Sequence, residues 1–200
     1  MTAPPPGDPI RASIDGVPLQ EYRLGLAGRT WSILHTGAVL SYADEQRFLH
    51  EGAKRLPYGV VLWPAAIALA HDLVTRADAL RGARVLELGA GTGLPGIVAA
   101  SLGAHVVQTD RNEAALRVCR LNGERNGVAN VDYRKAEWTT WQDADRYDGI
   151  IGSDILYVTR LHEHLRRIFE RCLAPGGRVL LADPFRVPSL ALLLALEHDG

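Results

Sequence analysis

From residue 84 onward, short apolar runs alternate with amphipathic segments whose apolar positions recur at helical spacing. The apolar runs predict five strands, at 85–88, 105–110, 131–134, 147–153 and 178–182. The amphipathic segments predict helices at 94–101, 113–126, 161–172 and 189–198. Because the strands are continuous apolar runs, we expect both faces of their sheet to be covered. The pattern therefore predicts an α/β fold with a doubly wound, mainly parallel sheet.

The first part of the chain has a different pattern. Short strands at 22–24 and 29–35, on either side of a turn at Gly28, predict a small β region. It belongs to an extension at 10–56, which also includes a polar, helix-like segment at 44–54. Pro64 suits the first turn of a helix with a buried face. We expect a disordered, proline-rich tail at 1–9 and the main domain at 57–200.

Composition narrows the class of protein. The chain has 200 residues, 47% of them hydrophobic and 22% charged, as in an ordinary globular domain. Its formal net charge of −1 gives no field that would gather nucleic acid or anionic lipid. No apolar run reaches membrane-spanning length, and the first residues do not resemble a signal peptide. We therefore expect a cytoplasmic protein that binds neither nucleic acid nor a membrane.

Cysteine and histidine spacing does not suggest a metal site. Cys119 and Cys172 are far apart and are expected to be two buried thiols. His162 and His164 lie two positions apart on a predicted helix, so they point in different directions, and we expect both at the surface. The sequence predicts no bound metal.

The first predicted strand runs directly into a glycine-rich segment, ELGAGTGLPG at 87–96. Its glycines fit G-x-G-x-x-G, but Glu87 would repel a pyrophosphate and Pro95 removes an N–H from the following helix. Both features disfavour a nicotinamide-type dinucleotide, and no Lys-Ser/Thr pair follows that would indicate a Walker A loop. A ligand with a cationic group and no phosphate, such as S-adenosylmethionine (SAM), suits this loop better.

The other strands also end in polar or aromatic residues, at the edge where such sheets bind ligands. Asp110 follows Gly91 by 19 positions, a spacing that suits a ribose-binding carboxylate, although Asp110 could instead be a helix cap or a turn residue. Glu137 and Trp138 could bind an adenine, or be a solvated and a half-buried side chain. Asp154 ends the central fourth strand and Tyr157 follows three residues later, which favours an acceptor site.

These motifs resemble those of class I (seven-β-strand) SAM-dependent methyltransferases, which have a Rossmann-like fold. The segment VLELGAGTGLPG at 85–96 is similar to their motif I. The segments PYGVVLWP at 57–64 and DILY at 154–157 resemble the protein lysine methyltransferase subgroup. The Trp63-Pro64 and Asp183-Pro184 pairs are most similar to the electron-transfer-flavoprotein β-subunit lysine methyltransferases and their bacterial relatives.

The resemblance implies roles for individual residues. Asp110 would bind the ribose of SAM, Glu137 and Trp138 the adenine, and Trp63 would line the pocket, although a tryptophan before a helix can also anchor the core. Asp154 would orient the acceptor amine and accept its proton, with Tyr157 beside it. The methionine part of SAM would be held by residues of the first strand and its loop, with the remaining pocket residues nearby: Glu87, Gly89, Ala90, Gly91, Gly93, Arg111 and Ser153.

The implied activity is methyl transfer from SAM to an amine, most simply a lysine side chain of a protein, with S-adenosylhomocysteine as product. Two alternatives stay open. The acceptor could be a small molecule or a protein histidine, or the protein could bind SAM without turnover.

The predicted fold also has an unusual end. The family's fold continues with two further strands that form a hairpin, whereas this chain stops after the helix at 189–198. We therefore expect the apolar segment 179–181 to lie on an edge strand, and the C-terminal hairpin to be missing.

Overall fold

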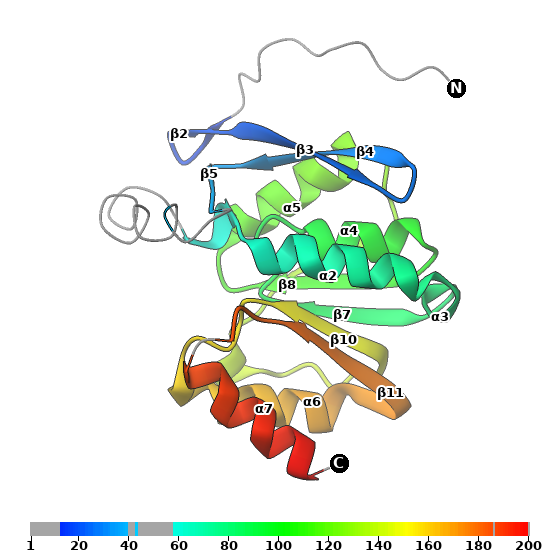
Figure 1. Ribbon diagram of the computed structural model, residues 1–200, viewed down its shortest axis with the longest axis vertical. Coiled ribbons are helices and arrows are strands. Elements are labelled where there is room, and N and C mark those ends of the chain that lie inside the picture. The colour runs from blue at the N-terminus through cyan, green and yellow to red at the C-terminus, as the bar shows by residue number, and fades with distance from the viewer. Residues whose placement is uncertain (1–12, 40–42, 44–57, 186, 200) are drawn as a thin grey trace.

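The computed structural model of the chain describes residues 13–39, 43, 58–185 and 187–199 (Figure 1). The predicted tail at 1–9 and the helix-like segment at 44–54 lie outside these residues.

The centre of the molecule is a five-stranded parallel sheet, as the apolar runs predicted. Its strands, in spatial order, are β11 (Leu173–Ala182), β10 (Tyr147–Ser153), β7 (Arg84–Leu88), β8 (His105–Asp110) and β9 (Val131–Lys135). The first strand in sequence, β7, lies in the middle, and the chain winds outward from it in both directions. The direction of winding therefore reverses between β7 and β10, where sheets of this kind bind their ligands.

Helices cover both faces of the sheet (Figure 1). The first face carries α2 (Pro64–Thr75), α4 (Leu94–Ser101) and α5 (Glu113–Arg125); the second carries α6 (His162–Cys172) and α7 (Val187–Asp199). Successive side chains of a strand serve the two layers in turn: Val85 packs with the first layer and Leu86 with the second. The fold thus has the predicted doubly wound architecture.

Short elements connect these layers. The helix α3 (Ala77–Leu80) follows α2, and a small parallel pair joins β5 (Gly37–Ala38) to β6 (Val61–Leu62). Among the described residues, 3₁₀ turns lie at Tyr58–Val60, Trp138–Thr140 and Thr159–Leu161. The helix predicted at 161–172 therefore begins as a 3₁₀ turn that leads into α6.

The N-terminal β region is an antiparallel hairpin packed on the first helical layer (Figure 1). It consists of β3 (Gln20–Leu26), which extends the strand predicted at 22–24 at both ends, and β4 (Arg29–His35), which has the predicted bounds. Trp31 of β4 is buried in the core formed with α2 and α4, while Leu34 packs with Val118 of α5. Before this hairpin, β1 (Ser13–Ile14) and β2 (Val17–Pro18) form a small additional ladder.

The strand β11 has only one strand neighbour among the described residues, so the predicted edge is confirmed. It begins at Leu173, before the predicted start at 178, because its pairing with β10 shifts register: Tyr147 aligns with Leu173 and Gly149 with Arg178. The apolar residues 179–181 are half-buried, since they pack against both core layers.

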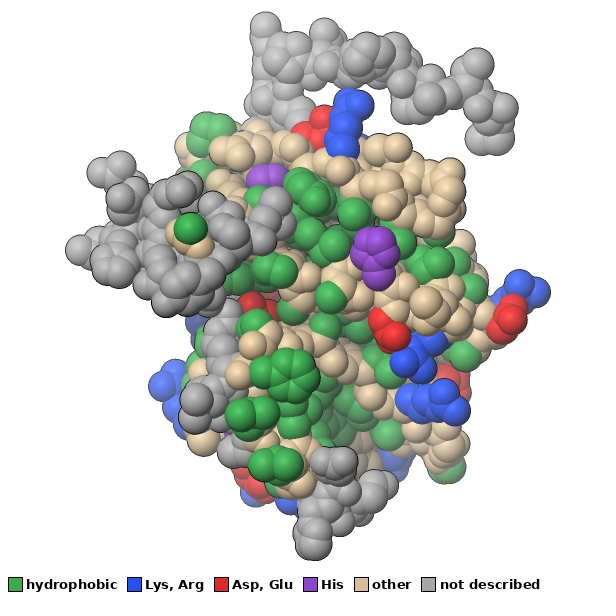
Figure 2. Space-filling model, in the orientation of Figure 1, with side chains coloured by type: hydrophobic (Ala, Val, Ile, Leu, Met, Phe, Trp, Pro, Cys, Tyr) green, Lys and Arg blue, Asp and Glu red, His purple; other side chains and the backbone are tan. Residues whose placement is uncertain are grey.

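Hydrophobic side chains also gather over α7 on the face shown in Figure 2. Leu190 and Leu194 of this helix are exposed. None of the helices formed by the described residues is long and apolar enough to cross a bilayer.

Candidate active site

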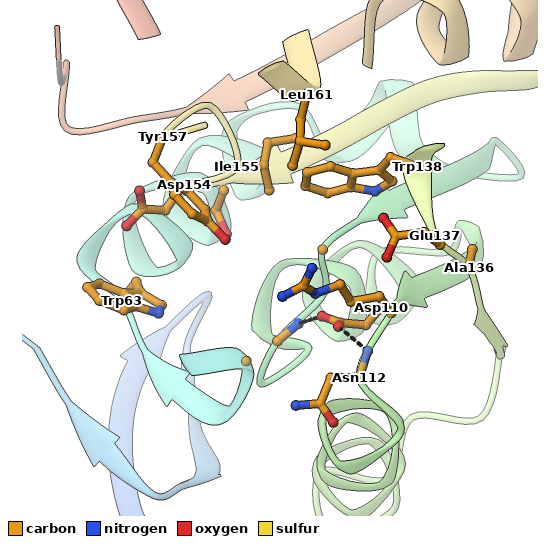
Figure 3. A pocket seen from close by; sticks show the side chains of 15 residues that line it. Trp63, Asp110, Asn112, Ala136, Glu137, Trp138, Asp154, Ile155, Tyr157 and Leu161 are labelled. Carbon is orange, nitrogen blue, oxygen red and sulfur yellow. Dashed lines mark hydrogen bonds between the residues drawn. The ribbon is translucent and has the colours of Figure 1, made fainter. Parts of the chain in front are cut away.

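A cavity of about 420 Å³ opens at the carboxyl ends of β7, β8, β9 and β10 (Figure 3). Ten of the residues singled out in the sequence line it: Trp63, Gly89, Gly91, Asp110, Arg111, Glu137, Trp138, Ser153, Asp154 and Tyr157. Its other lining residues were not predicted: Gly59, Asn112, Ala136, Ile155 and Leu161. Most of these adjoin a predicted residue in sequence, and that adjacency was the available signal.

The cavity has two distinct ends (Figure 3). Glu137 and Trp138, which follow β9, lie at one end, which we call the adenine end. Trp63, Asp154 and Tyr157 lie together at the other, which we call the acceptor end. The strand order brings residues that are some 90 positions apart in the sequence into one site.

The glycine-rich segment forms the cavity floor because its backbone makes turns that favour glycine. Gly93, which precedes α4, has a φ of +80°, and Gly89 has a φ of +64°. A Cβ on Gly89 would also lie 3.0 Å from the side chain of Ile155, in the segment that follows β10. The floor therefore touches the segment that carries Asp154.

Asp110 holds the glycine loop against the end of β8. Its two carboxylate oxygens accept hydrogen bonds from the backbone N–H groups of Gly91 (3.1 Å) and Asn112 (2.8 Å). Burial raises the pKa of this carboxyl group. The N-cap of α5 is Asn112, whose Oδ1 accepts from the N–H of Ala114 at 2.9 Å. Asp110 is therefore not the cap of α5, but its bond to the N–H two residues further on makes it a turn residue, as the other half of the alternative had it.

Glu87 lies under the glycine loop and does not line the cavity. Its side chain accepts hydrogen bonds from the Nε2 group of Gln108 (2.6 Å) and the backbone N–H of Gly96. Only 1% of Glu87 is exposed, and this burial raises its pKa to about 8. A Cβ on Gly96 would collide with the carboxyl group, so glycine is required for this approach. The resemblance implied that Glu87 helps to hold the methionine part of SAM; that role stays a prediction, and in this structure its carboxyl group lies outside the cavity lining.

Ala90 and Gly93 are also absent from the cavity lining. Both belong to the loop's own backbone bonding: the Gly93 N–H donates to the Ala90 carbonyl at 2.7 Å, and the Ala90 N–H donates to the Thr109 carbonyl at 2.9 Å. They shape the loop from behind.

The acceptor end is built on a strained backbone. Asp154 has a φ of +54°, which is uncommon outside glycine, and its N–H donates to the carbonyl of Ala182 at 2.8 Å. Three residues later, Tyr157 is 55% exposed. Between them, the carbonyl of Leu156 accepts a hydrogen bond from Nε2 of His162 at 2.8 Å. The prediction that His162 is a surface residue is wrong, since only 8% of it is exposed.

Both cysteines are free and buried, as predicted. Cys119 lies behind the glycine loop, where its Sγ donates to the carbonyl of Gly91 at 3.2 Å, and burial raises its pKa well above the usual value. Within the described part of the chain, no group of three or more His, Cys, Asp or Glu side chains is placed to hold a metal ion.

A family model described as lysine methyltransferase matches residues 44–187. Curated relatives of known name also match. The chain is 36% identical to the protein N-lysine methyltransferase METTL21A of Xenopus tropicalis, over 76% of this chain and 72% of that protein. It is 38% identical to the histone-arginine methyltransferase METTL23 of Xenopus laevis, over 54% of this chain and 49% of that protein.

The branch suggested by the tryptophan-proline pair is also among the relatives. The electron transfer flavoprotein beta subunit lysine methyltransferase of Xenopus laevis is 33% identical over 65% of this chain and 53% of that protein. Among solved structures, the Thermus thermophilus 16S rRNA N2 G1207 methyltransferase RsmC superposes with a TM-score of 0.61 at 19% identity, covering 92% of this chain and 47% of that one. That likeness shows the fold.

Proposed function

Because the chain belongs to the lysine methyltransferase family, we propose that its cavity is the active site for methyl transfer from SAM to a lysine side chain of a protein. The chain is a SAM-dependent methyltransferase, as its family is. The observation that carries the proposed acceptor site is the position of Asp154 and Tyr157 at the end of the cavity opposite Glu137 and Trp138.

The cavity suits SAM by charge and by shape. Three carboxyl-bearing residues, Asp110, Glu137 and Asp154, line it together with one guanidinium, that of Arg111. This balance favours a ligand that carries an ammonium and a sulfonium. The glycine floor also leaves room for a ligand to approach the backbone closely.

We assign the cofactor contacts along the cavity. Gly89 and Gly91 would face the methionine part, and Asp110 would accept hydrogen bonds from the ribose with the lone pairs that its backbone bonds leave free. At the adenine end, Glu137 would accept from the base, and the indole of Trp138 would pack against it. Arg111, Ser153 and Trp63 would complete the lining, while Glu87, Ala90 and Gly93 support the loop from behind.

At the acceptor end, Asp154 prepares the amine. When bound, SAM supplies a methyl carbon activated by its sulfonium, and S-adenosylhomocysteine is the product. A lysine side chain has a pKa near 10.4 in water, so it arrives as an ammonium that must lose a proton. Asp154 would accept an N–H hydrogen bond, fix the direction of the nitrogen lone pair and take the proton directly or through water. Tyr157 and Trp63 would exclude water, which disfavours the ammonium.

The nature of the acceptor is the finer part of the proposal. An anionic group flanked by two aromatic side chains suits any cationic or amine acceptor. Lysine is favoured because the family model and METTL21A point to it, whereas METTL23 is named for arginine. A histidine side chain and a small amine are the remaining alternatives.

The test is to incubate the protein with radiolabelled SAM and a cell lysate, and to follow the label on a gel before and after protease treatment. We expect a protease-sensitive band whose hydrolysate contains labelled methyl-lysine. Labelled methylarginine or methylhistidine would instead show that the acceptor is arginine or histidine. Label confined to the small-molecule fraction would overturn the protein substrate. An Asp154→Asn variant is the matched control, since it should label nothing above background.

A further inference from the structure

Three successive carbonyl groups of the glycine loop are held from behind by buried side chains. Gln108 Nε2 donates to the Gly93 carbonyl at 2.8 Å, and Cys119 Sγ donates to that of Gly91 at 3.2 Å. Asn122 Nδ2 donates to the carbonyl of Thr92, between them, at 2.8 Å. The loop's path is therefore fixed by contacts on the side away from the cavity.

Asn122 differs from the other two because it also reaches outside the central domain. Its Oδ1 accepts from the N–H of Leu34 at 2.7 Å, and its Nδ2 donates to the Leu34 carbonyl at 3.0 Å. Leu34 belongs to β4 of the N-terminal hairpin, which lies across α5 (Figure 1). One amide thus joins the hairpin, α5 and the glycine loop.

Asn122 has no alternative partner in water. Its exposed fraction is 0%, and both N–H groups and its oxygen are used in the three bonds. Thr92 is only 3% exposed, so its carbonyl also depends on this amide. Removing the side chain would leave buried polar groups without partners, which costs more than an exposed hydrogen bond would.

One turn after Asn122, at the C-cap of α5, Asn126 makes the same pattern without touching the loop. Its Oδ1 accepts from the N–H of Ser32 at 2.9 Å, and its Nδ2 donates to the Ser32 carbonyl at 2.8 Å. Its Nδ2 also donates to the Asn122 backbone carbonyl at 2.8 Å, and its own carbonyl accepts from the Arg29 side chain of the hairpin at 2.7 Å. Asn126 therefore secures the hairpin alone, and gives a matched control for Asn122.

We propose that Asn122 is a positioning residue for cofactor binding, through which the N-terminal hairpin holds the glycine loop in its binding shape. Neither Asn122 nor the hairpin strands β3 and β4 line the cavity. The inference rests on SAM occupying that cavity. It gives the N-terminal hairpin a part in the methyltransferase site, and it predicts that cofactor binding and hairpin stability are coupled in both directions.

The first experiment compares Asn122→Ala with Asn126→Ala by calorimetric titration of SAM and by thermal unfolding. Both variants should lose stability, since each removes two hairpin contacts. Only Asn122→Ala should weaken SAM binding, by roughly five- to tenfold for one lost hydrogen bond. The rate at saturating SAM should change less than the KM for SAM. Equal SAM affinities in the two variants would overturn the inference.

A second measurement uses the unaltered protein, so it decides even if Asn122→Ala does not fold. Residue-resolved amide exchange is followed with and without saturating SAM. The N–H of Leu34, bonded to Asn122, should exchange several-fold more slowly with SAM, and that of Ser32, bonded to Asn126, should change less. No slowing at Leu34, or equal slowing at both, would overturn the coupling. Failure of the unaltered protein to bind SAM would instead refute the cofactor site itself, and this inference with it.

Discussion

At the floor of the cavity, the carbonyls of Gly91, Thr92 and Gly93 are each held by a buried side chain, whereas at the acceptor end Tyr157 is 55% exposed. The floor is a part of the hydrogen-bonded core, and the acceptor end is a short segment that leaves β10 with one residue in a strained conformation. The difference matches the two ligands. A cofactor of fixed shape can be met by a rigid surface, while a protein substrate must reach its site from outside.

The largest effect is expected from Asp154→Asn, which changes the acceptor end alone. Asparagine tolerates a positive φ, so the backbone should keep its shape, but the amide cannot accept a proton as the carboxylate does. We expect the rate of label transfer to protein to fall at least about 100-fold, as for loss of a general base. The dissociation constant for SAM, measured by calorimetry, should stay within about twofold.

The exposed carboxylate of Glu163 offers the control, because Glu163→Gln alters a side chain outside the cavity and should change neither quantity. Full activity in Asp154→Asn would remove Asp154 from the reaction.

The next largest effect is expected at the cavity floor, on the affinity for SAM. Asp110→Ala removes the proposed ribose acceptor and two bonds to the loop backbone. We expect the dissociation constant for SAM to rise about 10- to 100-fold, the range for a lost hydrogen bond to a charged group. Glu113→Ala, three residues away, removes an exposed carboxylate and should leave SAM binding unchanged. An unaltered SAM affinity in Asp110→Ala would refute the ribose assignment.

The smallest effect on SAM binding is expected from Glu87→Gln, which tests whether Glu87 supports the glycine loop or contacts SAM. Glu87→Gln keeps a neutral side chain where the native protein holds a proton up to about pH 8, while the unfolded chain releases it near pH 4.5. Between these values the native state binds more protons, so the native protein loses stability as pH rises. The melting temperature of Glu87→Gln relative to the native protein should therefore climb by about ten degrees from pH 5 to pH 8, then level off.

SAM binding by Glu87→Gln should stay within about twofold at pH 7. A much larger loss would mean that the charge of Glu87 contacts the cofactor after all, as the resemblance implied.

The sequence was most informative where the pattern is local. The strands β8 and β10 and the helix α4 begin and end where apolar runs, glycines and a helix-starting proline predicted. The early ladder of β1 and β2 was missed, although the Asp15-Gly16 pair between them is a strong hairpin signal.

The sequence predicted which residues gather at the carboxyl edge of the sheet, because each of them lies at the end of a predicted strand. Side chains that follow a parallel strand reach one common edge, so Asp110, Trp138 and Asp154 could be gathered without coordinates. Whether a side chain at that edge faces the cavity or the core could not be predicted. Glu87 belongs to β7 itself and points under the loop, and His162 turns inward to a carbonyl six residues away. Both outcomes depend on tertiary packing that no local pattern records.

The thiol of Cys119 can report on local opening around the glycine loop. It is buried on α5 beside the carbonyl of Gly91, and burial raises its pKa, so an alkylating reagent can react with it only after this part of the fold opens locally. The second thiol, Cys172, is the last residue of α6 and is buried in the other core layer, so its labelling reports opening on the opposite face of the sheet. Comparing the two labelling rates by mass spectrometry therefore distinguishes opening around the glycine loop from opening on the other face. The measurement needs no dye, mutation or known substrate.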